Sequence, residues 1–203
     1  MFGIATQRSA EMGVADSGNW FALKTRAQHE KVVRDRLRKL GFEHLLPILL
    51  RVSQWHDRKK VIEAPLFPGY CFARLADEHR STVLQLPGVA YIVGHGGKAE
   101  AIPHQEIEAL RRLGRSGLQY EAAFSLVEGD PVEIIRGPLA GVRGTLVCRE
   151  RSHHVIIGVK LIQQGAKIKV DVEHVRRIED PATGGRIVDA GRLTQSEYAL
   201  AAR

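Results

Sequence analysis

The chain has 203 residues, of which 44% are hydrophobic, and its formal net charge is +7. A chain of this length forms one or two domains, and because no apolar run approaches the roughly 20 residues that cross a bilayer, we expect no membrane span. Residues 1–18 lack the continuous apolar core of a signal peptide, so they predict a loose N-terminal extension and a cytoplasmic protein.

The cysteine content predicts neither a disulfide framework nor a structural metal site. Cys71 and Cys148 are the two cysteines, they lie far apart in sequence, and neither belongs to a metal-ligand spacing. Such isolated cysteines are typical of small buried side chains in a reducing compartment. We therefore expect no metal and no cofactor.

The positive charge is concentrated in the first half of the chain. Residues 19–113 hold 16 Lys and Arg against 10 Asp and Glu, a net charge of +6, whereas residues 126–179 hold 9 against 7, a net charge of +2. A basic excess confined to one part of a chain indicates contact with a polyanion, usually nucleic acid. Ordinary solubility charge is the alternative interpretation.

The chain opens with a strand and a helix. Residues 20–25 are aromatic and β-rich and predict a short strand. Residues 27–41 predict an amphipathic helix, because Val33, Leu37 and Leu40 lie at i, i+4 and i+7. The same segment provides a left-handed cap and two acid–base pairs at i, i+4, namely Gly41, Glu30–Arg34 and Asp35–Lys39.

The next elements complete a mixed domain. Two β-rich runs at 45–56 and 59–75 flank a polar turn and predict a hairpin. Residues 77–88 predict a short helix, 89–97 a strand ending in a glycine turn, and 103–114 a helix that ends at its terminal glycine. This order predicts an α+β fold at 19–113, an antiparallel sheet with helices packed on it.

The second half of the sequence has a different residue pattern from the first. Residues 114–125 lack periodicity and predict a linker, and the polar, Gly-rich residues 180–203 predict a poorly ordered tail. Between them lie five short β-branched runs separated by turn residues, which predict a small five-stranded, SH3-like barrel at 126–179. The runs are 131–137, 142–150, 153–162, 166–172 and 174–178.

Two motifs carry a resemblance to a known family. "EGDPVEIIRGPLAGVRGTL" at 128–146 resembles the KOW motif, and "WFALKTRAQHEKVVRDRL" followed by "APLFPGYCFARL" resembles the N-terminal (NGN) domain of NusG-type transcription elongation factors. The order of the two motifs is also that of the family, and the resemblance covers residues 19–178. The segment from Leu66 to Gly97 is similar to the specialised RfaH-like and capsule-operon regulators.

The resemblance implies a non-catalytic, monomeric factor that modulates pausing and termination by bridging the RNA polymerase cleft. In the family, an aromatic depression around the Phe-Pro-Gly-Tyr turn binds the clamp of the polymerase, and we expect exposed rings there; an ordinary core is the alternative. The matching positions are Trp20, Phe21, Phe67, Pro68, Gly69, Tyr70 and Phe72. A second contact, across the cleft, falls on His79, Arg80, Ser81 and Thr82, for which a solvated helix turn is the alternative.

The resemblance also implies contact with the non-template DNA strand through the basic helix and its leading loop. The matching positions are Arg26, His29, Lys31, Arg34 and Arg36, and their alternative interpretation is a solvated helix face with internal ion pairs. The basic segment 55–60 lies at the tip of the predicted hairpin. An ordinary charged turn is the favoured interpretation of that tip.

In the predicted barrel, the family binds a small-subunit ribosomal protein or the Rho terminator through an apolar patch, which falls here on Leu139, Val142, Leu161 and Ile162. The housekeeping factor usually carries Phe in this loop, where this sequence has Leu and Val. RfaH-like proteins can refold this domain into a helical hairpin, but its β-branched runs predict the barrel as the stable form.

Two other function classes compete with this prediction. A ribosome- or rRNA-associated KOW protein would explain the basic charge but not the separate aromatic domain. An enzyme would need a nucleophile elbow, a phosphate-binding loop, a zinc spacing or paired carboxylates, and the sequence has none of these patterns. We therefore expect no catalytic residues.

Overall fold

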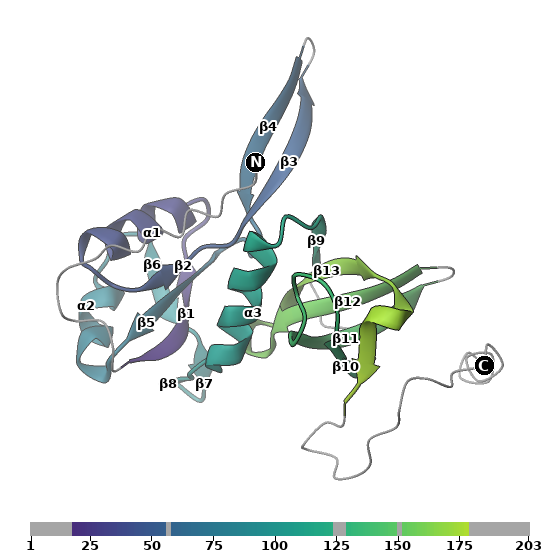
Figure 1. Ribbon diagram of the computed structural model, residues 1–203. Coiled ribbons are helices and arrows are strands. Elements are labelled where there is room, and N and C mark those ends of the chain that lie inside the picture. Colours follow the sequence, from purple (N-terminus) through teal and green to yellow (C-terminus); the bar gives the residue numbers. More distant parts are fainter. Residues whose placement is uncertain (1–17, 56–57, 124–128, 150–151, 179–203) are drawn as a thin grey trace.

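The computed structural model describes residues 18–55, 58–123, 129–149 and 152–178 (Figure 1). The predicted N-terminal extension, apart from its last residue, and the predicted C-terminal tail lie outside the described residues. So do the two central residues of the hairpin tip and the junction where the linker was expected to meet the barrel. No helix in the described part of the chain is long and apolar enough to span a membrane.

The N-terminal domain is built on a four-stranded antiparallel sheet. Its strands are β1 (Asn19–Thr25), β2 (His44–Leu45), β5 (Tyr70–Leu75) and β6 (Val89–Ile92), in the order β2-β5-β1-β6. The predicted first strand is therefore confirmed, and it occupies a central position between β5 and β6. Successive side chains of a strand lie on opposite faces of the sheet. Because Trp20, Phe21, Ala22 and Leu23 of β1 are all apolar, both faces need a cover.

Three α-helices provide that cover. They are α1 (Glu30–Lys39), α2 (Arg80–Leu84), which follows the 3-10 turn η1 (Asp77–His79), and α3 (His104–Arg115). Gly41 follows α1 with φ +78°, as the left-handed cap requires.

The end of α3 differs from the sequence prediction. Gly114 was expected to stop this helix, but it lies inside α3, which continues to Arg115. The N–H of Ser116 then donates to the carbonyl of Leu113 and closes the last turn.

The acid–base pairs of α1 also differ from the i, i+4 expectation. The Glu30 carboxylate accepts a hydrogen bond from the N–H of Gly69 (2.6 Å), thirty-nine positions along the chain. Asp35 pairs with its neighbour Arg34 (2.9 Å) and with Arg38 (3.3 Å) at i+3. Helix spacing permits an ion pair, but the buried carboxylate of Glu30 is instead satisfied by a backbone N–H from another part of the fold.

A long two-stranded arm projects from this domain. It consists of β3 (Ile48–Trp55) and β4 (Arg58–Pro65), which pair only with each other, as the predicted hairpin requires (Figure 1). A second, very short hairpin is formed by β7 (Gly94–His95) and β8 (Lys98–Ala99).

The two faces of the N-terminal sheet belong to different hydrophobic clusters. Alternate residues of β1 separate them, since Phe21 and Leu23 lie in one cluster and Trp20 and Ala22 in the other. The first cluster includes residues of α1 and α2, and the second includes Ile107, Leu110 and Leu113 of α3. The α+β prediction is confirmed, with α1 and α2 on one face and α3 on the other.

The cluster beneath α1 and α2 contains Cys71, whose side chain is fully buried. Burial raises the pKa of this thiol to about 12, so the thiolate is absent at ordinary pH. We expect iodoacetamide at pH 8 to leave Cys71 unmodified in the folded protein and to alkylate it in urea, as read by mass spectrometry of the Cys71 peptide. Rapid alkylation of that peptide without urea would contradict its place in the core.

The C-terminal sheet has six strands in the order β14-β10-β11-β12-β13-β9. The five β-branched runs each form a strand, but the predicted count of five is wrong because part of the expected linker adds a sixth. The strands are β9 (Tyr120–Ala123), β10 (Asp130–Ile134), β11 (Arg143–Arg149), β12 (Ser152–Val159), β13 (Gln164–Val170) and β14 (Val175–Arg177), with 3-10 turns η2 (Lys160–Ile162) and η3 (Val172–His174).

The helix α3 lies between the two sheets (Figure 1). The hydrophobic cluster on the α3 side of the N-terminal sheet continues into the C-terminal sheet, where it includes Val132, Ile134 and Val155. One continuous apolar core therefore joins both halves of the chain, and α3 contributes to it from the middle.

Candidate functional site

The Phe-Pro-Gly-Tyr segment forms a tight turn between the arm and β5. The N–H of Tyr70 donates to the carbonyl of Phe67 (3.1 Å), and Gly69 has φ +80°. A type II turn requires a positive φ at its third position, usually supplied by glycine, and proline is common at its second position. A Cβ on Gly69 would lie 2.9 Å from Nζ of Lys24, the end of a flexible side chain that can shift, so the backbone angle rather than a lack of space favours glycine here.

The turn is fixed to the domain from two sides. The carboxylate of Glu30, itself buried, accepts the hydrogen bond from the N–H of Gly69. The carbonyl of Gly69 accepts a hydrogen bond from the N–H of Thr25 at the end of β1 (2.9 Å). Both backbone polar groups of Gly69 are thereby satisfied, and the turn is held rigidly against α1 and β1.

The expected exposure of the aromatic rings is wrong for most of them. Phe67 is 1% exposed and packs edge-to-face on Phe72, with ring centroids 5.6 Å apart. Trp20, Phe21 and Phe72 are also buried. The turn directs Phe67 back into the α3-side core rather than outward. Sequence pattern does not fix that direction, because proline and glycine define the turn but not the side on which it packs.

An aromatic surface exists nevertheless, on different residues. Tyr70, Lys24 and Tyr91 are neighbours across β5, β1 and β6, because Lys24 is paired with Tyr70 on one side and Tyr91 on the other. A bulge in β6 places Tyr91 opposite Lys24, and Tyr91 is 53% exposed. The Lys24 ammonium lies 4.0 Å from the centre of the Tyr70 ring. We call these three residues the tyrosine–lysine row.

The row belongs to the face of the sheet that α3 partly covers. Lys24 follows Trp20 and Ala22 in alternation along β1, and Tyr70 packs against the same cluster as these residues. Pro68, next to Tyr70 in the turn, is exposed. Tyrosine rings beside a lysine offer apolar area, hydrogen bonding and charge together, which is the composition of a protein-binding surface. The sequence reasoning missed Lys24 and Tyr91, and only the strand register reveals them.

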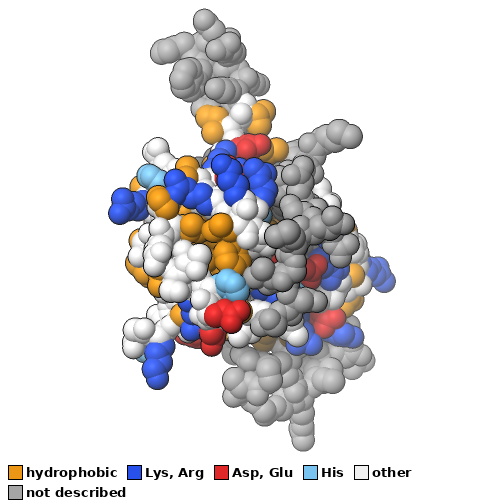
Figure 2. Space-filling model, turned by 90° about the vertical axis from the view of Figure 1, so that its left-hand side faces the viewer, with side chains coloured by type: hydrophobic (Ala, Val, Ile, Leu, Met, Phe, Trp, Pro, Cys, Tyr) orange, Lys and Arg blue, Asp and Glu red, His pale blue; other side chains and the backbone are white. Residues whose placement is uncertain are grey.

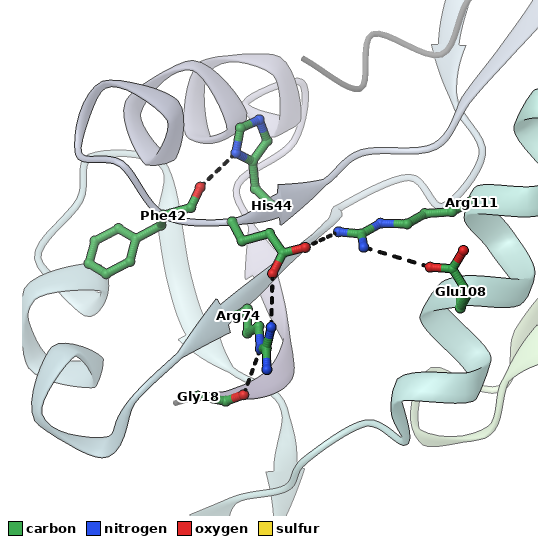
Figure 3. Close-up of polar contacts among 7 residues, drawn as sticks. Gly18, Phe42, His44, Arg74, Glu108 and Arg111 are labelled. Atoms are coloured by element: carbon green, nitrogen blue, oxygen red, sulfur yellow. Dashed lines mark hydrogen bonds and ion pairs between the residues drawn. The ribbon is translucent and has the colours of Figure 1, made fainter. Parts of the chain in front are cut away.

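Glu43, immediately before β2, forms ion pairs that connect the elements around the site (Figure 3). Glu43 bonds Arg111 of α3 (2.6 Å) through one oxygen and Arg74 of β5 (3.3 Å) through the other. Arg74 also donates to the carbonyl of Gly18 (2.8 Å), and the Arg111 guanidinium lies 4.9 Å from the centre of the Trp20 ring. Glu43 thus links α3, β5 and the start of β1.

The four residues expected to form the second contact do not share one environment in the structure. The His79 ring packs edge-to-face on Phe42 (5.4 Å), and Arg80 lies over the Phe21 ring (4.5 Å) while pairing with Asp77 (2.7 Å). These two side chains therefore serve the domain's own packing. Two further members of the set, Ser81 and Thr82, remain exposed.

The predicted DNA-contacting residues gather along α1 and the loop before it. Arg26 and His29 are exposed. Lys31 pairs with Glu63 at the base of the arm (3.2 Å) and Arg34 with Asp35, while Arg36 is partly exposed on the same helix. Internal pairing is thus present, as the alternative interpretation expected.

Figure 2 shows the face that carries α1 and α2, with Lys and Arg side chains gathered beneath the arm. His44, which the sequence analysis did not single out, lies close to the positive charges of Arg34 and Arg38. Burial, together with Arg34 and Arg38, lowers its pKa below the ordinary value, so its ring is neutral near pH 7. The surface charge therefore comes from Lys and Arg and not from this histidine.

The apolar patch predicted on the barrel is covered in this structure. Leu139, Val142 and Ile162 are buried and Leu161 is partly buried, all within the cluster that contains α3. These residues were expected to face a partner, and here they face the protein's own helix. The expected surface exposure is therefore wrong for this arrangement of the two halves.

Two side chains of α3 close the same junction with polar contacts. Arg112 donates to the carbonyls of Ala140 (2.5 Å) and Pro138 (3.4 Å), and Glu106 accepts a hydrogen bond from the N–H of Lys160 (3.2 Å). Burial raises the pKa of Glu106 above its ordinary value, although the Lys160 contacts oppose that shift. Neither residue was predicted to have a role, because the sequence of an amphipathic helix does not show which of its polar side chains contact another domain.

The described residues offer no site for metal-dependent chemistry. Among them, no group of three or more His, Cys, Asp or Glu side chains is placed to hold a metal ion. The surfaces described above present aromatic rings together with guanidinium and ammonium groups.

Comparisons with known proteins find similarity to NusG proteins. Residues 18–111 match the NusG family, described as "Transcription termination factor nusG". The transcription termination/antitermination protein NusG of Thermus thermophilus is 27% identical over 148 residues, which are 63% of this chain and 80% of that protein.

Solved structures are also similar to this chain. The Thermotoga maritima NusG structure, described as a study of domain interaction, is 24% identical with a TM-score of 0.44, covering 80% of this chain and 98% of that one. An MjSpt4:Spt5 complex is 20% identical with a TM-score of 0.27, covering 79% and 97%.

The matched segment starts beside β1 and ends within α3, so it coincides with the N-terminal sheet, the arm and their helices. The C-terminal sheet lies outside this match, so its resemblance to the KOW motif stays a prediction. The similarity of the segment from Leu66 to Gly97 to the RfaH-like paralogues also stays a prediction. The N-terminal domain of this chain is therefore similar to the NusG family over residues 18–111, and the chain as a whole is similar to the transcription termination/antitermination protein NusG of Thermus thermophilus.

Proposed function

We propose that this protein is a non-catalytic elongation or antitermination factor that binds RNA polymerase through its N-terminal domain. The observation that carries the proposal is the family match over 18–111, because it covers most of the N-terminal domain, on which the candidate polymerase and DNA contacts lie. The proposed localisation is cytoplasmic, where the polymerase works.

The tyrosine–lysine row is the proposed polymerase contact. It replaces the exposed aromatic notch expected around Phe67, whose ring supports the turn from within the core. Tyr70 and Tyr91 supply large rings that lose little conformational entropy on binding, and Lys24 between them supplies charge. The turn that carries Pro68 and Tyr70 is already rigid, which lowers the cost of binding.

Ser81 and Thr82 form the proposed second contact, across the cleft. If the protein touches both sides of the cleft, it binds the closed clamp more tightly than the open one. Such differential affinity shifts the polymerase toward the closed state and thereby suppresses pausing and termination. The basic residues of α1 and its leading loop would meanwhile contact the non-template DNA strand.

The C-terminal half would recruit a further partner, such as a small-subunit ribosomal protein or Rho, through Leu139, Val142, Leu161 and Ile162. Because α3 covers this patch, recruitment requires the two halves to separate. The apparent affinity for the partner would fall in proportion to the fraction of molecules that are open. Arg112 and Glu106 are the polar contacts that would have to break.

The test of the polymerase contact is a pull-down with core RNA polymerase. We expect Tyr70→Ala and Tyr91→Ala each to weaken binding by about tenfold, the loss typical of a buried aromatic anchor. Leu84→Ala is the matched control, because Leu84 is 45% exposed but lies on α2, which covers the other face of the sheet.

Equal binding by all three variants would exclude the tyrosine–lysine row as the contact. Co-purification of ribosomal particles without polymerase would instead favour the ribosome-associated alternative. Circular dichroism of each variant serves to show that the fold is unchanged.

A further inference from the structure

The strand β9 belongs to the C-terminal sheet by its contacts, although it comes from the segment that was expected to be a linker. All four of its residues pair with residues 165–168 of β13, and the two strands lie side by side (Figure 1). The Glu121 carboxylate also pairs with the Lys167 ammonium (3.1 Å). β9 therefore adds a strand to one edge of the C-terminal sheet.

One side chain of β9 also reaches the N-terminal domain. The Tyr120 hydroxyl donates to the carbonyl of Ile48 at the base of the arm (3.0 Å). The N–H of Leu66 donates to the carbonyl of Pro47 (2.8 Å). In an antiparallel ladder the next pair along, here Ile48 with Pro65, directs its polar groups away from the partner strand. The Ile48 carbonyl thus lies on the outer edge of β3, where β4 cannot reach it, and Tyr120 satisfies it.

The chain between α3 and β9 is short and is held by local contacts. It comprises residues 116–119, of which 117–119 are exposed. The Ser116 hydroxyl donates to the carbonyl of Leu113 (2.6 Å) and accepts from the N–H of Leu118 (3.1 Å). Gly117 has φ +71°, and a Cβ there would meet nothing within 4 Å. Such a segment can change its backbone angles at little cost in free energy.

We propose that the two halves separate by rotation about residues 116–119, with β9 moving as part of the C-terminal sheet and the Tyr120–Ile48 hydrogen bond as the latch to the arm. The inference rests on the proposed function, in which the halves separate to uncover the apolar patch. Opening the β9–β13 ladder would leave a row of backbone groups unpaired. Rotation at 116–119 keeps that ladder and breaks one side-chain hydrogen bond of β9.

The position of the hinge determines how far the halves can separate. Residues 116–119 span at most about 14 Å, whereas a tether that included β9 and extended to β10 would span roughly 50 Å. With the short tether, the apolar patch stays close to α3 after opening. Its effective concentration at that helix remains high, so a partner must compete with closure of the two halves.

Amide hydrogen exchange of the full-length protein, followed by NMR, distinguishes the two kinds of opening. The N–H of Lys160 donates to the Glu106 carboxylate of α3 (3.2 Å), so its exchange reports separation of the halves. The amides of β9 that bond to β13 report opening of the ladder. We expect Tyr120→Phe to speed exchange at Lys160 by about twofold to tenfold, the factor for one neutral hydrogen bond, and to leave β9 exchange unchanged. Tyr91→Phe is the matched control, because it removes a hydroxyl from an exposed ring outside the junction, and it should change neither.

A pair of insertions tests where the hinge lies. About eight Gly and Ser residues inserted after Gly117 make the tether about three times as long, which lowers the probability of closure. We expect exchange at Lys160 to become about fivefold faster. The same insertion after Ser125, between β9 and β10, falls within the C-terminal half and should leave exchange at Lys160 unchanged.

Three results would overturn parts of this assignment. Equal acceleration at β9 and Lys160 in Tyr120→Phe, or an equal effect of the two insertions, would show that β9 does not move with the C-terminal sheet. Unchanged exchange at Lys160 in Tyr120→Phe would exclude Tyr120 as the latch. Exchange at Lys160 as slow as that of the most protected core amides would show that the halves separate only on global unfolding. That last result would overturn the hinge and the recruitment step of the proposed function, but it would leave polymerase binding by the N-terminal domain to its own pull-down test.

Discussion

Replacing Phe67 with alanine is expected to lower the free energy of unfolding by about 3–5 kcal/mol, the range for truncating a buried phenylalanine. The ring is 1% exposed and makes an edge-to-face contact with Phe72. Such a pair contributes about 0.5–1.5 kcal/mol beyond the area that it buries. The loss combines that contact, the lost transfer free energy and the cavity that remains.

A urea titration followed by circular dichroism measures this loss. Tyr70→Ala is the matched control, because it removes a ring from the same turn but from a partly exposed position. We expect its effect on unfolding to be clearly smaller. A loss below about 1 kcal/mol for Phe67→Ala would place that ring outside the core, since surface substitutions rarely cost more.

This prediction also determines how polymerase binding is tested. A Phe67→Ala variant that no longer binds could have lost its fold rather than its contact. The tyrosine–lysine row avoids that ambiguity, because its two tyrosines lie at least partly on the surface. Loss of binding by Tyr70→Ala or Tyr91→Ala with an unchanged unfolding transition would therefore identify a contact.

Local pattern was sufficient for most of the elements. The aromatic, β-rich run of β1 and the β-branched runs of the second half predict strands, because such residues favour extended backbone. The apolar stripe of α3 predicts a helix, because burial on one face imposes the helical period. β9 is different, since Tyr120–Ala123 has weak β propensity. It becomes a strand because the tertiary fold leaves the edge of β13 available for pairing.

The candidate site was less predictable for a related reason. Its chemistry depends on which side chains become neighbours across strands, and the bulge that brings Tyr91 opposite Lys24 leaves no pattern in the sequence. The surface exposure predicted for the apolar patch of the C-terminal half was wrong for a different reason. Leu139 and Val142 lie in the segment that resembles the KOW motif, but a sequence does not state which apolar surface another helix of the same chain will cover.

Glu43 is expected to be the most consequential single charge in the N-terminal domain, because it bonds both Arg74 and Arg111. At pH 7 we expect Glu43→Gln to lower the free energy of unfolding by about 1–2 kcal/mol. This is the lower part of the range for hydrogen bonds to charged groups, because water screens a side chain that is one-third exposed.

The effect should depend on pH in a definite direction. Partial burial alone would raise the pKa of Glu43, but the hydrogen bonds and charges of Arg111 and Arg74 lower it below the ordinary value of 4.5. A carboxyl with a lowered pKa stabilises the fold above its unfolded-state pKa, and that stabilisation is lost as the pH falls through the folded-state pKa. The stability difference between wild type and Glu43→Gln should therefore be full at pH 7 and shrink toward zero as the medium becomes more acidic than pH 4.5.

Urea titrations of both proteins at several pH values measure that difference directly. Glu63→Gln is the matched control, since Glu63 pairs with Lys31 in an exposed ion pair that water screens strongly. We expect it to change stability by less than about 0.5 kcal/mol at any pH. A stability difference for Glu43→Gln that stayed constant with pH would show that the glutamine disturbs packing, and that the link between α3, β5 and β1 does not depend on the charge of Glu43.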